Sequence, residues 1–203
     1  MHSRVKTGAS AGAASPQSSA AGYGATAIGL HWIVALMIFA AFALGLYMTS
    51  IPGLSMLKLK LFSWHKWLGV TVFAIAVLRV LWRATHRAPA PAAGTPAWQA
   101  AAAHGAHMLL YVLIVVVPVT GYLYSLAAGV PVVYLGLWPL PVLIGKDEGL
   151  AEILKQTHIW LNYLMAAIVV IHAAAAVKHQ FIERDGTLAR MLPFLKQGVK
   201  RKA

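Results

Sequence analysis

The amino-acid sequence predicts an all-α integral membrane protein, a bundle of four transmembrane helices. Hydrophobic residues make up 60% of the 203 residues and charged residues only 11%, against about 25% charged residues in soluble domains. Four apolar stretches are each long enough to cross a hydrocarbon core of about 30 Å as a helix. These predicted spans cover residues 27–48, 64–82, 104–126 and 157–179.

The four spans form one predicted domain, residues 25–193, between two polar tails. Residues 1–24 are mostly small and polar and lack the apolar core of a signal peptide, so they predict a disordered cytoplasmic tail. Residues 194–203 predict a basic C-terminal tail. The segments between and after the spans are predicted as a loop over 51–63, a proline-rich linker over 84–99, a long connection over 127–153 and a short interfacial helix over 181–193.

The formal net charge of +12 bears on partners and on orientation. The basic residues flank the apolar spans instead of forming one surface, which favours anchoring at an anionic bilayer surface over nucleic-acid binding. With the N-terminus inside, 12 lysines and arginines fall on the cytoplasmic side and 5 on the outer side. The excess predicts that both termini are cytoplasmic.

Two histidines mark the fourth span, which has no charged residue between Ile159 and Val177. His158 lies near its start and His172 near its end. His172 follows His158 by fourteen positions, which corresponds to a rise of about 21 Å and a rotation about 40° short of four turns. Both imidazoles therefore face the same side of the helix at opposite depths. Ionisable groups inside a span are costly and indicate function.

Two further histidines match these depths. His31 opens the first span, at the level of His172, and His65 opens the second span, at the level of His158. Two depth-matched pairs are what bis-imidazole ligation of two b haems needs. The sequence has no cysteine, so the haems would be bound non-covalently. Zinc or copper binding remains open, as does an interfacial role for each histidine.

Other polar residues lie at the same two levels. Arg79, fourteen residues after His65, falls near the inner pair, where it either binds a haem propionate or snorkels to headgroups. His104 and His107 open the third span and are read as structural residues or as neighbours of a substrate. The outer side carries a group of lysines that would attract a small anion, namely Lys58, Lys60, Lys66 and Lys155.

At these residues the sequence resembles the bacterial cytochrome b561 family in its four-span, di-haem form. The segments that carry the resemblance are GLHW at 29–32, WHKWLG at 64–69, RVLWR at 79–83, HGAH at 104–107, LPVLIGKDE at 140–148 and DGTLARMLP at 185–193. The resemblance implies haem ligands at His31, His65, His158 and His172. It also implies a bacterial inner-membrane location and a quinone site near His179.

Two axial imidazoles leave haem iron no open position, which favours electron transfer. We therefore expect electron transfer between an outer donor and a membrane quinone, with His179 as a candidate proton donor because imidazole titrates near neutral pH. The resemblance implies superoxide as donor and ubiquinone as acceptor, which would make the chain an oxidoreductase. Two alternatives stay open: a haem-bearing subunit of a membrane dehydrogenase or hydrogenase, and a haem-free metal transporter or sensor.

Overall fold

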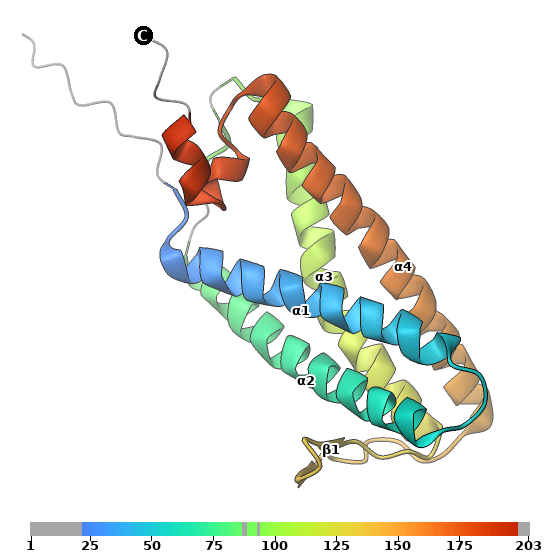
Figure 1. Ribbon diagram of the computed structural model, residues 1–203. Helices are drawn as coiled ribbons and strands as arrows, with labels where there is room; N and C mark the ends of the chain where they lie inside the picture. Colours follow the sequence, from blue (N-terminus) through green and yellow to red (C-terminus); the bar gives the residue numbers. More distant parts are fainter. Residues whose placement is uncertain (1–21, 87–88, 93, 199–203) are drawn as a thin grey trace, which may run out of the picture.

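A computed structural model describes residues 22–86, 89–92 and 94–198 of the chain (Figure 1). Most of the predicted N-terminal tail and the last part of the predicted basic tail, residues 1–21 and 199–203, lie outside the described residues. The predicted all-α fold class is confirmed. Four long helices make up the bundle: α1 (Ala25–Ser50), α2 (Met56–Thr85), α3 (Ala97–Ala127) and α4 (Glu148–Lys178).

The outside of the bundle is apolar. Each of the four helices contains a stretch long and apolar enough to cross a membrane. Side chains such as Leu36, Val170 and Ile171 expose 64%, 66% and 65% of their surface. An exposed apolar surface of this extent would be unfavourable in water. An α-helix satisfies its own backbone groups, as a bilayer requires, except at Pro118 of α3, which has no amide to donate to the preceding turn. The chain is therefore a multi-pass membrane protein.

Both α2 and α4 begin well before the apolar spans that predicted them. Ser55 caps α2 and Asp147 caps α4, each accepting a hydrogen bond from the backbone amide three residues later, at 3.2 and 2.9 Å. The loop predicted over 51–63 is therefore wrong beyond Ser55, and the connection predicted over 127–153 ends at Asp147. Hydropathy shows only how long the apolar part of a helix is. A helix with a capped N-terminus can extend beyond the hydrocarbon core of the bilayer through turns that carry charged residues.

The linker predicted over 84–99 is also shorter than expected. Helix α2 runs to Thr85, where its last turn reaches past Arg83, and α3 begins at Ala97. Pro96 immediately precedes α3 and has an extended backbone, with φ −58° and ψ 144°. A proline at this point costs nothing, because the first amides of a helix have no intrahelical acceptor.

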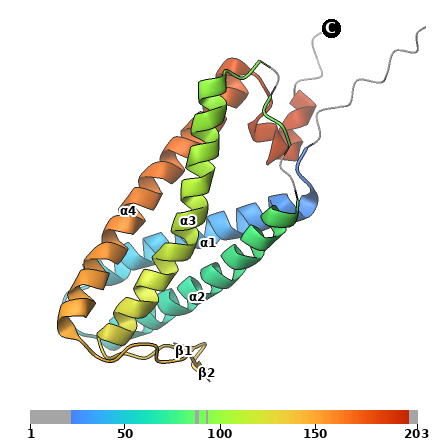
Figure 2. The ribbon, with the colours of Figure 1, turned by 180° about the vertical axis from the view of Figure 1, so that it is seen from behind.

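The helices pack as two pairs, α1 along α2 and α3 along α4, with α2 joining the pairs through α3. The common core consists of small and medium apolar side chains from three helices: Ala76, Leu113, Ile114, Val117 and Met165. The pairs meet at the end where α1 passes into α2 and spread apart toward the end where α1 begins and α4 ends (Figures 1 and 2).

A small β-hairpin marks the end at which the pairs meet, which we call the hairpin end. Strands β1 (Val133–Tyr134) and β2 (Trp138–Pro139) pair antiparallel. Leu135 and Gly136 between them have φ of 53° and 72°, the left-handed conformations of a tight hairpin turn. The sequence did not predict the hairpin, because two-residue strands are too short to show an alternating pattern.

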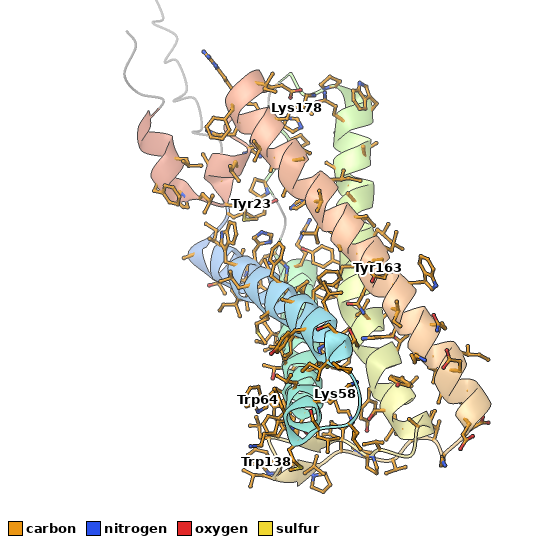
Figure 3. All side chains as sticks on the ribbon, turned by 45° about the vertical axis from the view of Figure 1, so that its right-hand side comes forward. Tyr23, Lys58, Trp64, Trp138, Tyr163 and Lys178 are labelled. Atoms are coloured by element: carbon orange, nitrogen blue, oxygen red, sulfur yellow. The ribbon has the colours of Figure 1, made fainter. Side chains whose placement is uncertain are left out.

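Hydrogen bonds fasten the hairpin to α2. The Trp67 indole donates to the Val133 carbonyl at 2.8 Å, and the hydroxyls of Thr71 and Tyr134 lie 2.9 Å apart. We call the opposite end of the bundle the terminal end. Side chains at the hairpin end include Lys58, Trp64 and Trp138, whereas Tyr23 and Lys178 lie toward the terminal end and Tyr163 between them (Figure 3).

Short helical turns follow α4 at the terminal end in place of the single helix predicted over 181–193. A π-helical turn, η1 (His179–Glu183), leads to the 3-10 turns η2 (Leu188–Arg190) and η3 (Pro193–Gly198). The Trp32 indole donates to the Met191 carbonyl at 2.9 Å. This bond ties the C-terminal turns to the start of α1, so they lie beside the open part of the bundle (Figure 1).

Candidate functional site

The structure brings His65 of α2 beside His158 of α4 near the hairpin end. Their ring centroids are 6.2 Å apart and the rings are nearly perpendicular, at 89°. An imidazole nitrogen binds a transition metal at about 2 Å and lies about 1 Å from its ring centroid, so two imidazoles on opposite sides of one iron have centroids about 6 Å apart. The observed separation fits one shared iron.

The hydrogen bond of His158 also fits a shared iron. The Nδ1 atom of His158 lies 3.0 Å from the Val117 carbonyl. Donation to that carbonyl places the proton on Nδ1 and leaves Nε2 free to bind metal. His65 Nδ1 is buried and has no hydrogen-bond partner among the residues that the structure describes. An unpaired buried nitrogen is costly unless another group completes its surroundings.

Two glycines keep the backbone close to these rings. A Cβ at Gly121 would lie 2.8 Å from His158 Cε1, and a Cβ at Gly45 would lie 3.3 Å from His65 Cε1. The first distance is too short for any side chain and the second is tight. Gly45 lies fourteen residues after His31 and so on the same face of α1.

A cavity of about 740 Å³ adjoins the His65–His158 pair, within the range of roughly 300–1,000 Å³ usual for small-molecule and cofactor sites. It is lined by His65, His158, Gly69 and Gly121 and by apolar side chains such as Phe73. A flat, mostly apolar group ligated by both imidazoles would suit this lining. The residues present therefore fit a haem at the hairpin end.

A second group of histidines lies toward the terminal end. The ring centroids of His31 and His172 are 6.4 Å apart, and His107 of α3 lies on His172 as well, with centroids 5.2 Å apart. Only the first separation reaches the value of about 6 Å for two imidazoles across one iron. The sequence had not placed His107 beside His172. His104, one turn earlier, is exposed.

Arg79 completes this inner group. Its guanidinium lies 3.2 Å from His31 Nδ1 and 5.6 Å from the centre of the Tyr111 ring. Within the described residues no carboxylate lies within ion-pair distance of Arg79. A guanidinium inside a membrane domain is costly unless an anion or a cavity compensates it.

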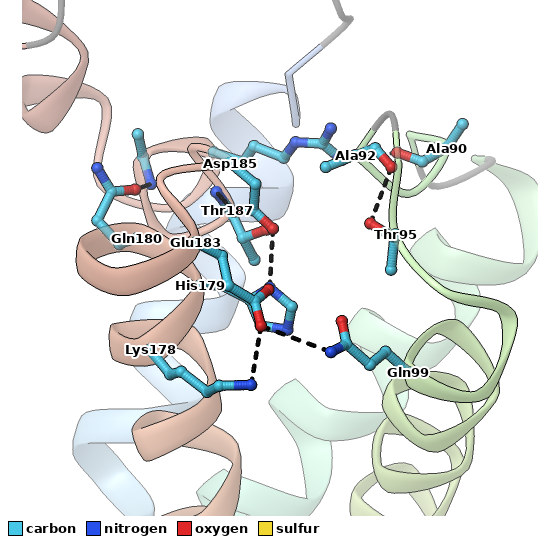
Figure 4. Close-up of polar contacts among 12 residues, drawn as sticks. Ala90, Ala92, Thr95, Gln99, Lys178, His179, Gln180, Glu183, Asp185 and Thr187 are labelled. Atoms are coloured by element: carbon cyan, nitrogen blue, oxygen red, sulfur yellow. Dashed lines mark hydrogen bonds and ion pairs between the residues drawn. The ribbon is translucent and has the colours of Figure 1, made fainter.

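His179 is at the terminal end of α4, in the π-helical turn. Its Nδ1 lies 2.7 Å from Glu183 Oε2 and 2.8 Å from Asp185 Oδ2 (Figure 4). These three side chains are the one group in the described part of the chain that offers three metal-ligating atoms together. Sequence spacing could not reveal the group, because the π turn and the left-handed Arg184, φ 57°, break helical periodicity.

Asp185 is held as an anion. Partial burial raises the pKa of its carboxyl, but hydrogen bonds from Thr187 and His179 outweigh that effect and hold the pKa below its ordinary value. The Thr187 amide donates to Asp185 Oδ1 at 2.8 Å. Asp185 therefore faces His179 with a fixed orientation and a negative charge.

The four predicted outer lysines do not play equal parts. Lys66 lines the cavity beside His65. Lys155 forms an ion pair with Glu152 at 2.8 Å, and Lys58 donates to the Ile51 carbonyl at 2.8 Å. Lys60 is exposed. Lys66 is thus the lysine of this set whose charge is best placed to act at the cavity.

Paired histidines on long apolar helices, beside a cavity of cofactor size, define a membrane protein of the haem-cytochrome class. A model of the family described as prokaryotic cytochrome b561 matches residues 22–194. The chain belongs to this family, and the predicted resemblance is confirmed. It is a membrane haem cytochrome, and members of its family typically bind haem b.

Similar proteins span almost the same length. Cytochrome b561 homolog 2 of Escherichia coli (strain K12) is 32% identical over 170 residues, covering 84% of this chain and 90% of the relative. Cytochrome b561 homolog 1 of the same organism is 30% identical over 172 residues, covering 83% and 95%. The probable superoxide oxidase CybB of Yersinia pestis is 25% identical over 175 residues, covering 84% and 96%.

Proposed function

We propose that this chain is a superoxide:ubiquinone oxidoreductase of the bacterial inner membrane that holds two b haems. His65 and His158 would hold one haem near the hairpin end, and His31 and His172 the other toward the terminal end. The observation that carries the haem part of the proposal is the pair of centroid separations, 6.2 and 6.4 Å. The choice of superoxide and ubiquinone follows the family resemblance and the relative named probable superoxide oxidase CybB. Bound haem would supply one-electron redox chemistry with no free coordination position.

The orientation follows from the basic residues. Along the sequence, 12 lysines and arginines fall in the two tails and in the segments next to the terminal end, among them Arg79, Arg83 and Lys178, whereas 5 fall in the segments next to the hairpin end. The positive-inside rule then assigns the terminal end to the cytoplasm and the hairpin end to the periplasm. On this assignment both chain termini are cytoplasmic, the donor reacts at the hairpin end, and quinone reduction near the terminal end can draw protons from the cytoplasm.

Arg79 would bind the haem held by His31 and His172. Its guanidinium lies at the level of these rings, 3.2 Å from His31 Nδ1, and a guanidinium only donates hydrogen bonds. A haem propionate is the anion we propose for it, because no protein carboxylate in the described region pairs with it.

Two side chains would act directly on the reactants. Lys66, at the cavity beside His65, would draw the superoxide anion toward the hairpin end. Its field adds to those of Lys58 and Lys60 nearby, whereas the charge of Lys155 is largely compensated by Glu152. His179 would donate a proton to the quinone at the terminal end. This assignment follows the family position and the exposure of the terminal end to cytoplasmic water.

The test is turnover by the purified haem-loaded protein with superoxide and a ubiquinone analogue. We expect quinol to form without any partner subunit, with two superoxide anions oxidised for each quinone reduced. Lys66→Gln should slow the reaction about threefold at low ionic strength and weaken its salt dependence. The matched variant Lys60→Gln should change the rate less, because Lys60 does not line the cavity.

Two outcomes would contradict the proposal. A protein that carries both haems but reduces quinone only beside a membrane dehydrogenase or hydrogenase would be an electron-transfer subunit. A colourless protein that binds zinc or copper would instead be a metal transporter or sensor. A rate that ignores ionic strength in the wild type would remove the steering role of Lys66.

A further inference from the structure

One nitrogen atom at the terminal end faces two acids. His179 Nδ1 lies 2.7 Å from Glu183 Oε2 and 2.8 Å from Asp185 Oδ2 (Figure 4). Both oxygens are acceptors when ionised, so the short distances require a proton on Nδ1. The other ring nitrogen, Nε2, is then the atom left for exchange with a substrate.

The backbone is shaped to bring Asp185 to this nitrogen. After the π turn, Arg184 adopts φ 57°, and the amide of Asp185 returns to donate to the His179 carbonyl at 3.1 Å. Gly186, at φ 75°, turns the chain again, so that the Thr187 amide can donate to Asp185 Oδ1. Asp185 thus uses one oxygen to hold its own loop and the other to hold the imidazole.

The two acids differ in how their charges are compensated. Glu183 forms an ion pair with Lys178 at 2.8 Å, and the Gln99 amide of α3 lies 3.5 Å from the same oxygen. Asp185 has no cation other than His179 within ion-pair distance in the described chain. The four charged groups sum to zero when His179 is protonated. Loss of the Asp185 charge would therefore oppose the imidazolium more than loss of the Glu183 charge.

We infer that Asp185 is a positioning residue that fixes the imidazole of His179 and stabilises its protonated form for proton donation to quinone. This inference rests on the proposed function. For each quinone, two superoxide anions lose one electron each and become dioxygen, and the quinone gains two electrons and two protons. His179 Nε2–H breaks as a quinone O–H forms. The neutral imidazole keeps its Nδ1–H on Asp185, regains a proton at Nε2 from cytoplasmic water and gives that proton to the second quinone oxygen, after which water restores the imidazolium.

The experiment compares Asp185→Asn with Glu183→Gln in the haem-loaded protein, following reduction of a ubiquinone analogue between pH 6 and 9. Asp185→Asn should slow the reaction about tenfold at pH 8, less at pH 6, since general acids contribute about 10²–10⁴-fold in all. Its rate should begin to fall at a lower pH than in the wild type. Glu183→Gln should have a smaller effect, and Asp185→Glu should restore most of the rate.

A second readout does not depend on turnover. In protein labelled with ¹⁵N-histidine, the wild type should show His179 with a proton on Nδ1, and Asp185→Asn should shift that signal. The haem absorption spectrum should be unchanged in every variant, which shows that the bundle is intact. Glu148→Gln, which removes an exposed acid paired with Lys146 toward the hairpin end, is the control for a general charge effect.

The outcomes separate this inference from the proposed function. If the wild type reduces quinone and His179→Ala is slow, but Asp185→Asn keeps the wild-type pH profile and histidine signal, the role of Asp185 is overturned. If Asp185→Asn is slow while His179→Ala is not, Asp185 does not act through His179, and the inference fails again. If the wild type carries haem but never reduces quinone, the proposed function fails, while the histidine signal still decides whether Asp185 holds the ring.

Discussion

At the residue scale, the closest packing around the histidines occurs at Gly121. A Cβ there would lie 2.8 Å from Cε1 of His158 and 3.1 Å from its Nδ1, so Gly121→Ala must displace the ring from the Val117 carbonyl. We expect the variant to lose the haem at the hairpin end and to retain the other. Haem content per chain, measured by extraction and absorption, should fall to about half.

Gly105→Ala is the matched control for this change. Gly105 lies in the same helix, but a Cβ there would meet no atom within 4 Å. Alanine favours a helix over glycine by about 1 kcal/mol, so Gly105→Ala should fold with its full haem content. A Gly121→Ala protein with wild-type haem content and spectrum would show that the outer pair does not hold haem as described.

Residue distances also decide between two partners for His172. His31 and His107 both lie beside it, at 6.4 and 5.2 Å between ring centroids. The second distance is about 1 Å too short for an iron between the two rings. The sequence predicts His31 as the partner of His172 by depth alone, and it did not predict that His107 lies beside His172. A helix rotation of a few tens of degrees decides which face of α3 meets α4.

At the element scale, the ionised carboxylate of Asp185 stabilises the short turns that follow α4. Because Asp185 has a lowered pKa in the folded protein, its ionised form contributes stability above the ordinary carboxyl pKa of 3.8. That contribution disappears as the pH falls through the lower folded value. We expect the protection of residues 185–192 against hydrogen exchange to fall on acidification from pH 5 to pH 3, relative to the protection of α3.

Asp185→Asn should remove this pH dependence, because the amide does not titrate in that range. The segment should then exchange faster already at pH 5. Glu148→Gln serves as a comparison, since Glu148 pairs with Lys146 at the hairpin end and does not touch the C-terminal turns. Acid-dependent exchange that survives in Asp185→Asn would mean that another group holds this segment.

How far the sequence predicts the structure can be judged element by element. The spacing of His158 and His172 correctly predicted one helix with both rings on one side, because α-helical geometry is regular. Helix ends were missed at Met56 and Glu148, where capping and charge decide rather than hydropathy. The hairpin and the His179 cluster escaped prediction because tight turns and a π turn leave no periodic pattern.

At the scale of the whole molecule, the two helix pairs meet at the hairpin end and separate toward the terminal end (Figure 2). The sequence predicted four helices and the depths of their histidines. It did not predict this spread, because the angles at which helices cross depend on the side chains at their contacts. The spread leaves the C-terminal turns beside the start of α1, where the Trp32 indole binds the Met191 carbonyl. His179 and its acids thus lie at the wide end of the bundle.

The central claim is that two haems are held by two separate pairs of imidazoles. The most direct measurement is the ratio of b haem to protein in the wild type and in alanine variants of the four proposed ligands and of His107. We predict two haems per chain in the wild type, one in His31→Ala or His65→Ala, none when both are replaced, and two in His107→Ala. A wild-type ratio of one, or loss of haem in His107→Ala but not in His31→Ala, would contradict the account.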